Sequence, residues 1–245
     1  MTINKYIFII SVGRSGSTLL QNLLNAHDNV LIRGENNNFF YYAMLAYQSL
    51  RKDIKNSLGK NISKEFSPWF GFNFYEEDTF LKTIYELGKK YLLGNKKNEL
   101  IEVLGFKEIR YFDLIESQQN NNHFNPILSE KNLCPRKKLK ALLSFLNITF
   151  KPSNFILLTR DVNEIVKSKW WNDSNIYDKD ILKKDINLFY DEIIRISMEE
   201  NLNLINIDYK ILKEKDHKKV NEKLFSKLGI KYNKTKATKI FLTEY

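Results

Sequence analysis

Residues 6–22, YIFIISVGRSGSTLLQN, join an apolar run to a turn of glycine and hydroxyl residues and then to a leucine pattern. The run 6–10 is typical of a buried parallel strand, and the leucines of residues 19–24 keep helical spacing. A strand, a glycine-rich turn and a helix together form an anion cradle, because backbone N–H groups and the positive helix end converge on one point. We therefore expect an anion to bind at the turn residues Gly13, Arg14, Ser15, Gly16, Ser17 and Thr18. The alternative is an ordinary strand-to-helix turn in which Ser17 caps the helix.

The turn differs from the usual nucleoside-triphosphate loop. The Walker pattern has a Gly, four further residues, and then Gly-Lys-Ser/Thr. Here Gly13 and Gly16 are three residues apart, and no lysine follows Gly16. The shorter loop favours an anion that is smaller than a triphosphate or placed differently.

A second segment, residues 154–171, has the sequence NFILLTRDVNEIVKSKWW. Its apolar run 155–159 predicts another buried strand, and helical spacing of apolar residues resumes at Val162. Arg160 lies at the carboxyl end of that strand, where α/β sheets bind ligands. Ser168 is expected about two turns along the following helix, which must then fold back over the ligand. The alternative is that Arg160 pairs with Asp161 or Glu164 and that Ser168 is solvated.

Together these segments resemble a known family. Residues 11–20 resemble the 5′-phosphosulfate loop of sulfotransferases that use 3′-phosphoadenosine 5′-phosphosulfate (PAPS), and Arg160 with Ser168 resembles their 3′-phosphate motif. The resemblance implies PAPS as sulfate donor, adenosine 3′,5′-bisphosphate as product and no metal. An arginine at position 14 looks most like the carbohydrate, tyrosylprotein and bacterial glycolipid branches, so the implied acceptor is a bacterial glycan, capsule precursor or glycolipid. Residues 204–209, LINIDY, are similar to a late strand of the family, which implies that Tyr209 lies near the nucleotide; alternatively it is a packing aromatic at a strand end.

Glu35 is the candidate general base for the acceptor hydroxyl. It follows the predicted strand 30–34 and therefore lies at the carboxyl edge of the sheet, near the first loop. The resemblance adds that several members carry a Gly-Glu pair here with the glutamate as base. Alternatively, Glu35 stabilises the positive end of the next helix.

Two cationic residues, Lys107 and Arg110, are further candidates for the site that contains Glu35. Lys107 ends the run VLGFK, where it could neutralise charge on the leaving group or on a sulfuryl oxygen. The resemblance implies that it shares this role with Arg14, because some members with the arginine loop have a lysine at a similar strand end. Arg110 is a candidate for binding the acceptor substrate, or it forms an ion pair with Glu108 or Asp113.

The elements alternate between strands and helices. This alternation predicts an α/β fold of the P-loop-like three-layer type, a parallel sheet with helices on both faces, in one domain spanning residues 1–245. Predicted strands are 6–11, 30–34, 100–106, 154–159 and 204–208. Predicted helices are 17–26, 37–52, 78–93, 135–147, 162–171, 178–200 and 218–228. Residues 117–132 are expected to form a loop, and the aromatic stretch 66–75 either lines a sugar groove or packs internally.

Composition limits the partners and the location. The formal net charge of +10 suits a phosphate-rich sulfate donor and an acidic glycan equally, and we expect no nucleic-acid partner. The single cysteine, Cys134, excludes an intramolecular disulfide, and the three histidines lack metal-ligand spacing. No apolar run reaches 18 residues, so the sequence predicts a cytoplasmic protein without a membrane span, and peripheral contact with a membrane stays open.

Two other classes of protein stay open. One is a nucleotide kinase or NTPase of a related fold, which the missing Gly-Lys-Ser/Thr and the Arg160–Ser168 pair disfavour. The other is a non-catalytic nucleotide- or glycan-binding protein, which the presence of Arg14, Glu35 and Lys107 disfavours.

Overall fold

The computed structural model describes residues 3–57, 60, 62–95, 100–115, 135–172 and 178–243. Within these ranges five strands form one sheet in the order β2-β3-β1-β4-β5, and every neighbouring pair is parallel. The strands are β1 (Lys5–Ser11), β2 (Val30–Arg33), β3 (Val103–Glu108), β4 (Ser153–Thr159) and β5 (Leu204–Asp208). The predicted parallel α/β fold is therefore confirmed. One strand differs, because β3 begins three residues later than predicted and continues through Lys107 to Glu108.

Helices follow the strands as predicted, with differences at the carboxyl-terminal end. The helices are α1 (Ser17–Asn25), α2 (Phe39–Ser57), α3 (Glu77–Leu93), α4 (Pro135–Thr149), α5 (Val162–Val166), α6 (Lys169–Asn172), α7 (Lys179–Glu199), α8 (Tyr209–Lys213), α9 (His217–Val220), α10 (Ser226–Leu228) and α11 (Lys234–Thr243). Short 3₁₀ turns occupy Phe72–Phe74 and Arg110–Leu114, and a π-helical turn occupies Asn221–Phe225. The predicted helix 162–171 was wrong in one respect, since the chain breaks between α5 and α6. Helix α11 was not predicted, and the predicted loop 117–132 lies outside the described residues.

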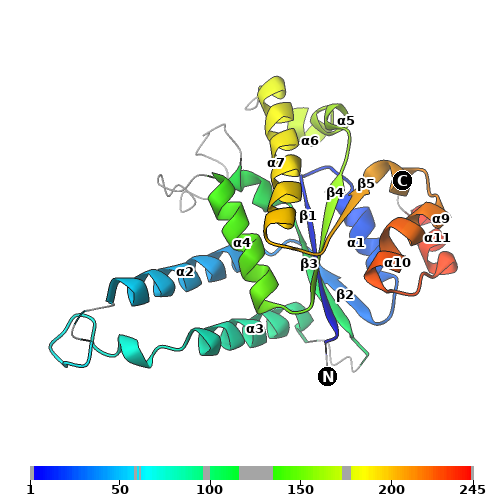
Figure 1. Ribbon diagram of the computed structural model, residues 1–245. Helices are drawn as coiled ribbons and strands as arrows, with labels where there is room; N and C mark the ends of the chain where they lie inside the picture. The colour runs from blue at the N-terminus through cyan, green and yellow to red at the C-terminus, as the bar shows by residue number, and fades with distance from the viewer. Residues whose placement is uncertain are drawn as a thin grey trace.

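The sheet is covered on both faces because its strands are apolar on both sides. In β1, Tyr6 and Phe8 belong to one buried cluster, while Ile7 and Ile9 belong to the other. Helices α2, α3, α4 and α7 cover the first face, and α1 with α8–α11 covers the second (Figure 1). A run that is buried on both faces is what a central parallel strand requires.

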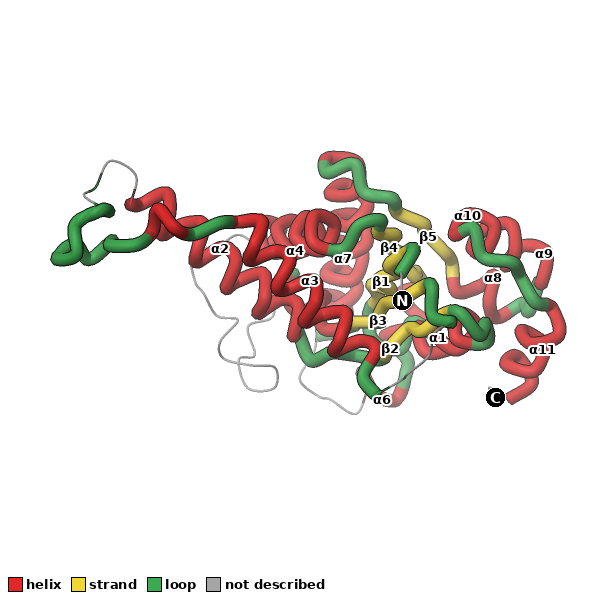
Figure 2. The backbone as a smooth tube through the Cα atoms, turned by 90° about the horizontal axis from the view of Figure 1, so that it is seen from below, coloured by secondary structure: helices red, strands yellow, loops and turns green. Residues whose placement is uncertain are grey.

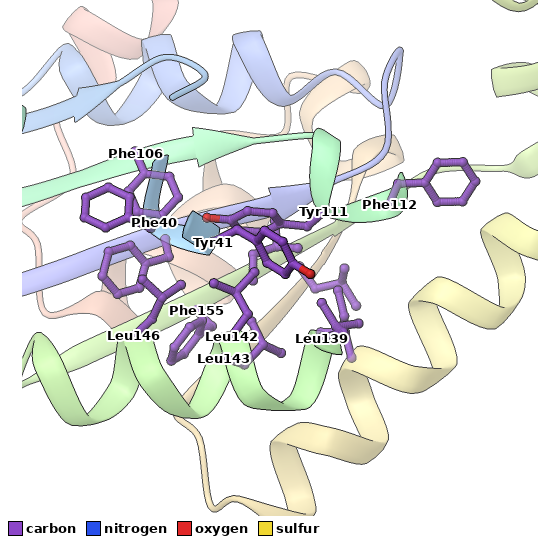
Figure 3. Packing of buried hydrophobic residues seen from close by; sticks show 14 of the residues in the cluster. Phe40, Tyr41, Phe106, Tyr111, Phe112, Leu139, Leu142, Leu143, Leu146 and Phe155 are labelled. Atoms are coloured by element: carbon purple, nitrogen blue, oxygen red, sulfur yellow. The ribbon is translucent and has the colours of Figure 1, made fainter. Parts of the chain in front are cut away.

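The first face holds the larger aromatic core. The rings of Phe40 and Phe106 stack with centroids 4.8 Å apart, which packs α2 directly on β3. Figure 3 shows the leucines of α4 pointing toward the sheet. These are Leu139, Leu142, Leu143 and Leu146, all of them buried.

Helices α2 and α3 form an arm. Figures 1 and 2 show the two helices running side by side away from the sheet, with the connecting segment at their far end. Midway along α2, the ring of Tyr47 stacks on that of Phe80 in the first turn of α3, with centroids 6.0 Å apart, and joins the two helices. Across the described residues, no helix is both long enough and apolar enough to cross a bilayer.

Candidate active site

A cavity of about 240 Å³ opens at the carboxyl edge of the sheet, beyond the ends of β1, β2 and β3. Both the predicted catalytic residues and the predicted anion-binding residues of the first loop contribute to the lining of this cavity. Its lining consists of Gly13, Arg14, Ser17, Thr18, Glu35, Lys107, Ile109 and Trp170. The structure thus brings the first loop to the same space as Glu35 and Lys107, as the position of each residue near the carboxyl end of its strand predicts.

The loop between β1 and α1 has left-handed backbone at two positions, Arg14 with φ 67° and Gly16 with φ 94°. Gly16 is the N-cap of α1, so Ser17 is the first helical residue rather than the cap. Among the described residues no side-chain hydrogen bond caps the first N–H groups of α1, and no acidic residue lies in its first turn. These N–H groups are therefore available to an anion.

The loop's own hydroxyl groups divide into two roles. Ser15 is fully buried, and its hydroxyl contacts that of Ser11, which in turn donates to the carbonyl oxygen of Leu158 at 3.0 Å. The Ser15 side chain therefore holds the loop in place. Ser17 and Thr18 instead line the cavity.

Two aromatic rings lie against the glycines of this loop. A Cβ atom added to Gly13 would stand 2.0 Å from the Trp170 ring, and one added to Gly16 would stand 2.2 Å from the Tyr209 ring. Glycine is thus required at both positions by rings from distant segments, in addition to the left-handed backbone at Gly16. Tyr209 follows β5 directly, and this position brings its ring to the loop.

Arg160 connects the two predicted anion-binding segments. Its Nη1 donates to the carbonyl oxygen of Arg14 at 2.9 Å, and its guanidinium carbon lies 4.5 Å from the centre of the Tyr209 ring. Its Nε and Nη2 donate to Glu164 at 3.0 and 2.8 Å, so the alternative ion pair with Glu164 also forms. These hydrogen bonds lower the pKa of the Glu164 carboxyl below its usual range. Asp161 instead caps α5 through the backbone N–H groups of residues 163 and 164.

Ser168 lies in the turn between α5 and α6 and not within a continuous helix. Its backbone N–H donates to Ile165 O at 3.0 Å, which closes the turn after α5. Its hydroxyl is buried and finds no hydrogen-bond partner within the described part of the chain. Buried polar atoms are nearly always paired, so this hydroxyl is suited to a ligand atom.

Glu35 is held by both predicted cations. Lys107 Nζ lies 2.8 Å from its Oε1, and Arg110 Nη1 lies 2.9 Å from its Oε2. Lys107 is nearly buried because it lies within β3 rather than after it. Helix α2 begins only at Phe39, so Glu35 is four residues before the helix and its carboxylate bonds cations instead of the helix end.

Comparison with known proteins identifies the family. A sequence model described as the sulfotransferase family matches residues 6–233. The chain belongs to the sulfotransferase family. The match extends across the first loop, Glu35, Lys107, Arg160 and Ser168, and membership supports sulfotransfer as the general activity.

A solved structure shares the fold of this family member. The sulfotransferase domain of the olefin synthase from Synechococcus PCC 7002 superposes with a TM-score of 0.53 at 13% sequence identity. The alignment covers 96% of this chain and 76% of that one. At this identity the likeness concerns the fold. A comparison with curated proteins gives no match.

Two further residues at this candidate site were missed from the sequence. Glu108 is fully buried and accepts hydrogen bonds from the backbone N–H groups of residues 36, 38, 109 and 110, as well as from Arg110 Nη1 at 3.3 Å. It therefore fixes the loop that carries Glu35, and a carboxylate ending a buried strand was the available signal. Trp170 lines the cavity, but its helical spacing indicated only packing.

The lysine-rich carboxyl-terminal segment is away from the site. Lys234, Lys236 and Lys239 lie on α11, which packs near α1 on the second face of the sheet. Lys236 pairs with Asp28 at 2.8 Å. Among the described residues no cluster of three His, Cys, Asp or Glu side chains could hold a metal ion.

Proposed function

We propose that this chain transfers the sulfuryl group of PAPS to a hydroxyl group of a glycan, capsule precursor or glycolipid acceptor. One observation carries the proposal: the Glu35 carboxylate, held by Lys107 and Arg110, shares a cavity with Arg14 and the start of α1. Sulfuryl transfer needs a base for the acceptor on one side and positive charge for the developing anion on the other. Both kinds of group line this cavity.

The residues around the cavity fit the sulfate donor. The uncapped N–H groups of α1 and the exposed Arg14 suit its 5′-phosphosulfate. Arg160 uses three of its five N–H donors on residues that the structure describes, which leaves two for the 3′-phosphate. The unpartnered hydroxyl of Ser168 adds a further donor. PAPS, when bound, supplies the sulfuryl group, and the protein supplies position and charge.

Each residue then has a definite role. Each Glu35 oxygen accepts one hydrogen bond from a cation and keeps a lone pair for the acceptor's hydroxyl proton. Lys107 lines the cavity beside Glu35 and, with Arg14, stabilises negative charge on the sulfuryl oxygens and the leaving phosphate. Arg110 positions Glu35 and is the candidate contact for the acceptor.

The proposal of a glycan or glycolipid acceptor is based on Arg14 in the first loop, because a loop with arginine at this position resembles the carbohydrate and glycolipid branches of the family. Trp170 is the aromatic side chain that lines the cavity, whereas the stretch 66–75, for which a sugar groove was one of two alternatives, contributes nothing to that lining. A ring beside the catalytic groups can stack on an apolar sugar face. We propose a cytoplasmic enzyme whose single domain spans residues 1–245.

Two assays test the proposed function: a melting experiment with nucleotides and a sulfate-transfer assay. Adenosine 3′,5′-bisphosphate at a hundred times its dissociation constant should stabilise the protein by about 2.7 kcal/mol, whereas ATP with Mg²⁺ should not. Transfer of labelled sulfate from PAPS to a glycan and glycolipid pool tests turnover. Stabilisation by ATP with Mg²⁺ and not by the bisphosphate would favour a kinase or NTPase instead. Stabilisation by the bisphosphate without any transfer would favour a binding protein.

A further inference from the structure

The far end of the α2–α3 arm exposes several large apolar side chains. We define the arm tip as residues 60 and 62–76, which connect the two helices. Phe66 is 83% exposed and Phe74 is 76% exposed, and Phe70 is also exposed. Exposed phenylalanines grouped on one short segment differ from the scattered apolar residues of an ordinary surface, and such groups mark interaction sites.

The arm tip is folded rather than extended. The backbone N–H of Phe70 donates to Ser67 O at 3.0 Å, that of Phe72 to Trp69 O at 3.3 Å, and that of Phe74 to Gly71 O at 3.0 Å. Gly71 has φ 85°, a conformation that favours glycine and closes the turn. The local hydrogen bonds therefore keep the phenylalanines outward on a compact turn.

The arm holds this tip away from the rest of the protein. Helix α2 has 19 residues, and at 1.5 Å per residue it spans about 28 Å. Both views of the backbone show the tip at the end of the arm, beyond the sheet and the other helices (Figures 1 and 2). No residue of the tip lines the catalytic cavity. The exposed rings thus neither complete the core nor shape the site.

Cationic side chains surround the rings. Lys60 Nζ lies 4.1 Å from the centre of the Trp69 ring, and Lys64 Nζ lies 5.6 Å from that of Phe66. Residues 51–76, from the last turns of α2 to the end of the arm tip, contain five lysines and arginines against three acidic residues. Aromatic and apolar side chains flanked by lysines are typical of segments that lie in the interface of an anionic membrane.

We propose that the arm tip docks on an anionic lipid bilayer, with Phe66, Phe70 and Phe74 entering the interface and Lys60 and Lys64 contacting the lipid headgroups. Exposed phenylalanine has no polar atom to bind a sugar hydroxyl, and the ammonium of Lys60 covers the Trp69 ring, so the tip suits lipid better than glycan. Docking would bring the enzyme to a surface without inserting a helix. The inference uses neither the sulfate donor nor the acceptor.

Flotation of the full chain with lipid vesicles tests the proposal. We expect binding to vesicles that contain phosphatidylglycerol, weaker binding to pure phosphatidylcholine, and loss of binding as salt is raised. The double variant Phe66→Ser and Phe74→Ser should weaken binding about tenfold or more. The control is Met198→Ser, because Met198 is 74% exposed on α7 of the body, and this variant should bind like the original protein.

Charge and fold need their own controls. Lys60→Gln with Lys64→Gln should weaken binding, whereas Lys227→Gln with Lys231→Gln, two exposed lysines outside the arm, should change it little. Unchanged melting temperatures confirm that the variants fold. Absence of vesicle binding, equal binding to neutral vesicles, or full binding by the phenylalanine double variant would overturn the proposal. So would saturable binding of a neutral oligosaccharide that the same double variant abolishes. Vesicle binding is measured without PAPS, so its outcome is separate from that of the transfer assay.

Discussion

Replacing Arg160 with alanine should remove the preference of the protein for adenosine 3′,5′-bisphosphate over 5′-AMP. The guanidinium has two N–H donors that no described residue uses, and a 3′-phosphate offers charged acceptors for them. A hydrogen bond to a charged group contributes roughly 1.5–3 kcal/mol, and about 1.4 kcal/mol changes affinity tenfold. Arg160→Ala should therefore weaken bisphosphate binding at least about tenfold.

The ratio of the two affinities isolates the 3′-phosphate contact. Arg160 also donates to the carbonyl oxygen of Arg14 and lies over Tyr209, so its loss loosens the first loop for both nucleotides. A common loss cancels in the ratio of the dissociation constants for bisphosphate and 5′-AMP, measured by calorimetry. Equal affinities of the original protein for the two nucleotides, or an unchanged ratio in Arg160→Ala, would refute the assignment.

Two neighbouring substitutions sharpen the test. Glu164→Gln removes the carboxylate that pairs with Arg160 but keeps its shape, so bisphosphate binding should persist or strengthen. Ser168→Ala removes a buried hydroxyl that has no partner among the described residues, so the ligand-free protein should melt at the same or a higher temperature. The same variant should nevertheless bind the bisphosphate more weakly. Reduced stability together with unchanged affinity would show that Ser168 is structural.

Four further predictions address catalysis, metal, pH and backbone. Glu35→Gln should reduce single-turnover transfer of labelled sulfate by about 10² to 10⁴ and leave bisphosphate affinity within about threefold, whereas near-normal transfer would refute its role as base. EDTA should leave transfer from PAPS unchanged, because cationic side chains supply the charge that Mg²⁺ supplies in phosphoryl transfer; activity lost with EDTA and restored by Mg²⁺ would contradict this. Burial lowers the pKa of His27, so below its unfolded pKa near 6.5 the unfolded chain binds more protons. The melting temperature should therefore fall between about pH 7 and 5, and His27→Gln should reduce that slope. Gly16→Ala should destabilise the protein by about 1–2 kcal/mol or more in urea unfolding, because of its positive φ and the Tyr209 ring, whereas Gly34→Ala, with no atom within 4 Å of its added Cβ, should change little.

The sheet and the first loop were predictable because local sequence determines them. Apolar runs such as 6–10 and 155–159 are buried on both faces, and few structures other than a central parallel strand accommodate them. Parallel strands all end at the same edge of the sheet. Because Arg14, Glu35 and Arg160 each follow a predicted strand, the sequence predicts that all three lie at that edge. The residues were therefore predictable as neighbours before their contacts were known.

The break before Ser168 was not predictable from spacing. Val162, Ile165 and Trp170 fit one continuous helix, and nothing local marks the end at Val166. The break follows from tertiary contact, since the Trp170 ring lies against Gly13 of a loop that is distant in sequence. Glycine at position 13 signals a turn, but it does not identify the ring that contacts it.

The sequence contains a signal for helix α11 that the predicted helices did not include. Asn233 Oδ1 accepts a hydrogen bond from the Lys236 backbone N–H at 3.0 Å, and Ala237 and Phe241, four residues apart, are buried. A capping asparagine before an apolar i, i+4 pair predicts a helix. The lysines at positions 234, 236 and 239 by themselves indicate only a solvated segment.

The two halves of the cavity are positioned by separate sets of contacts. The loop that carries Arg14 is held by Arg160, Trp170 and Tyr209, which come from the edge formed by β4 and β5. The loop that carries Glu35 follows β2 and is held by Glu108, whose buried carboxylate accepts hydrogen bonds from backbone N–H groups of that loop and of the segment after β3. Because no side chain belongs to both sets, a substitution that disturbs one half should leave the other in place. A substitution in the half that carries Glu35 should therefore reduce transfer and leave sulfate-donor binding in place, whereas one in the half that carries Arg14 should reduce both.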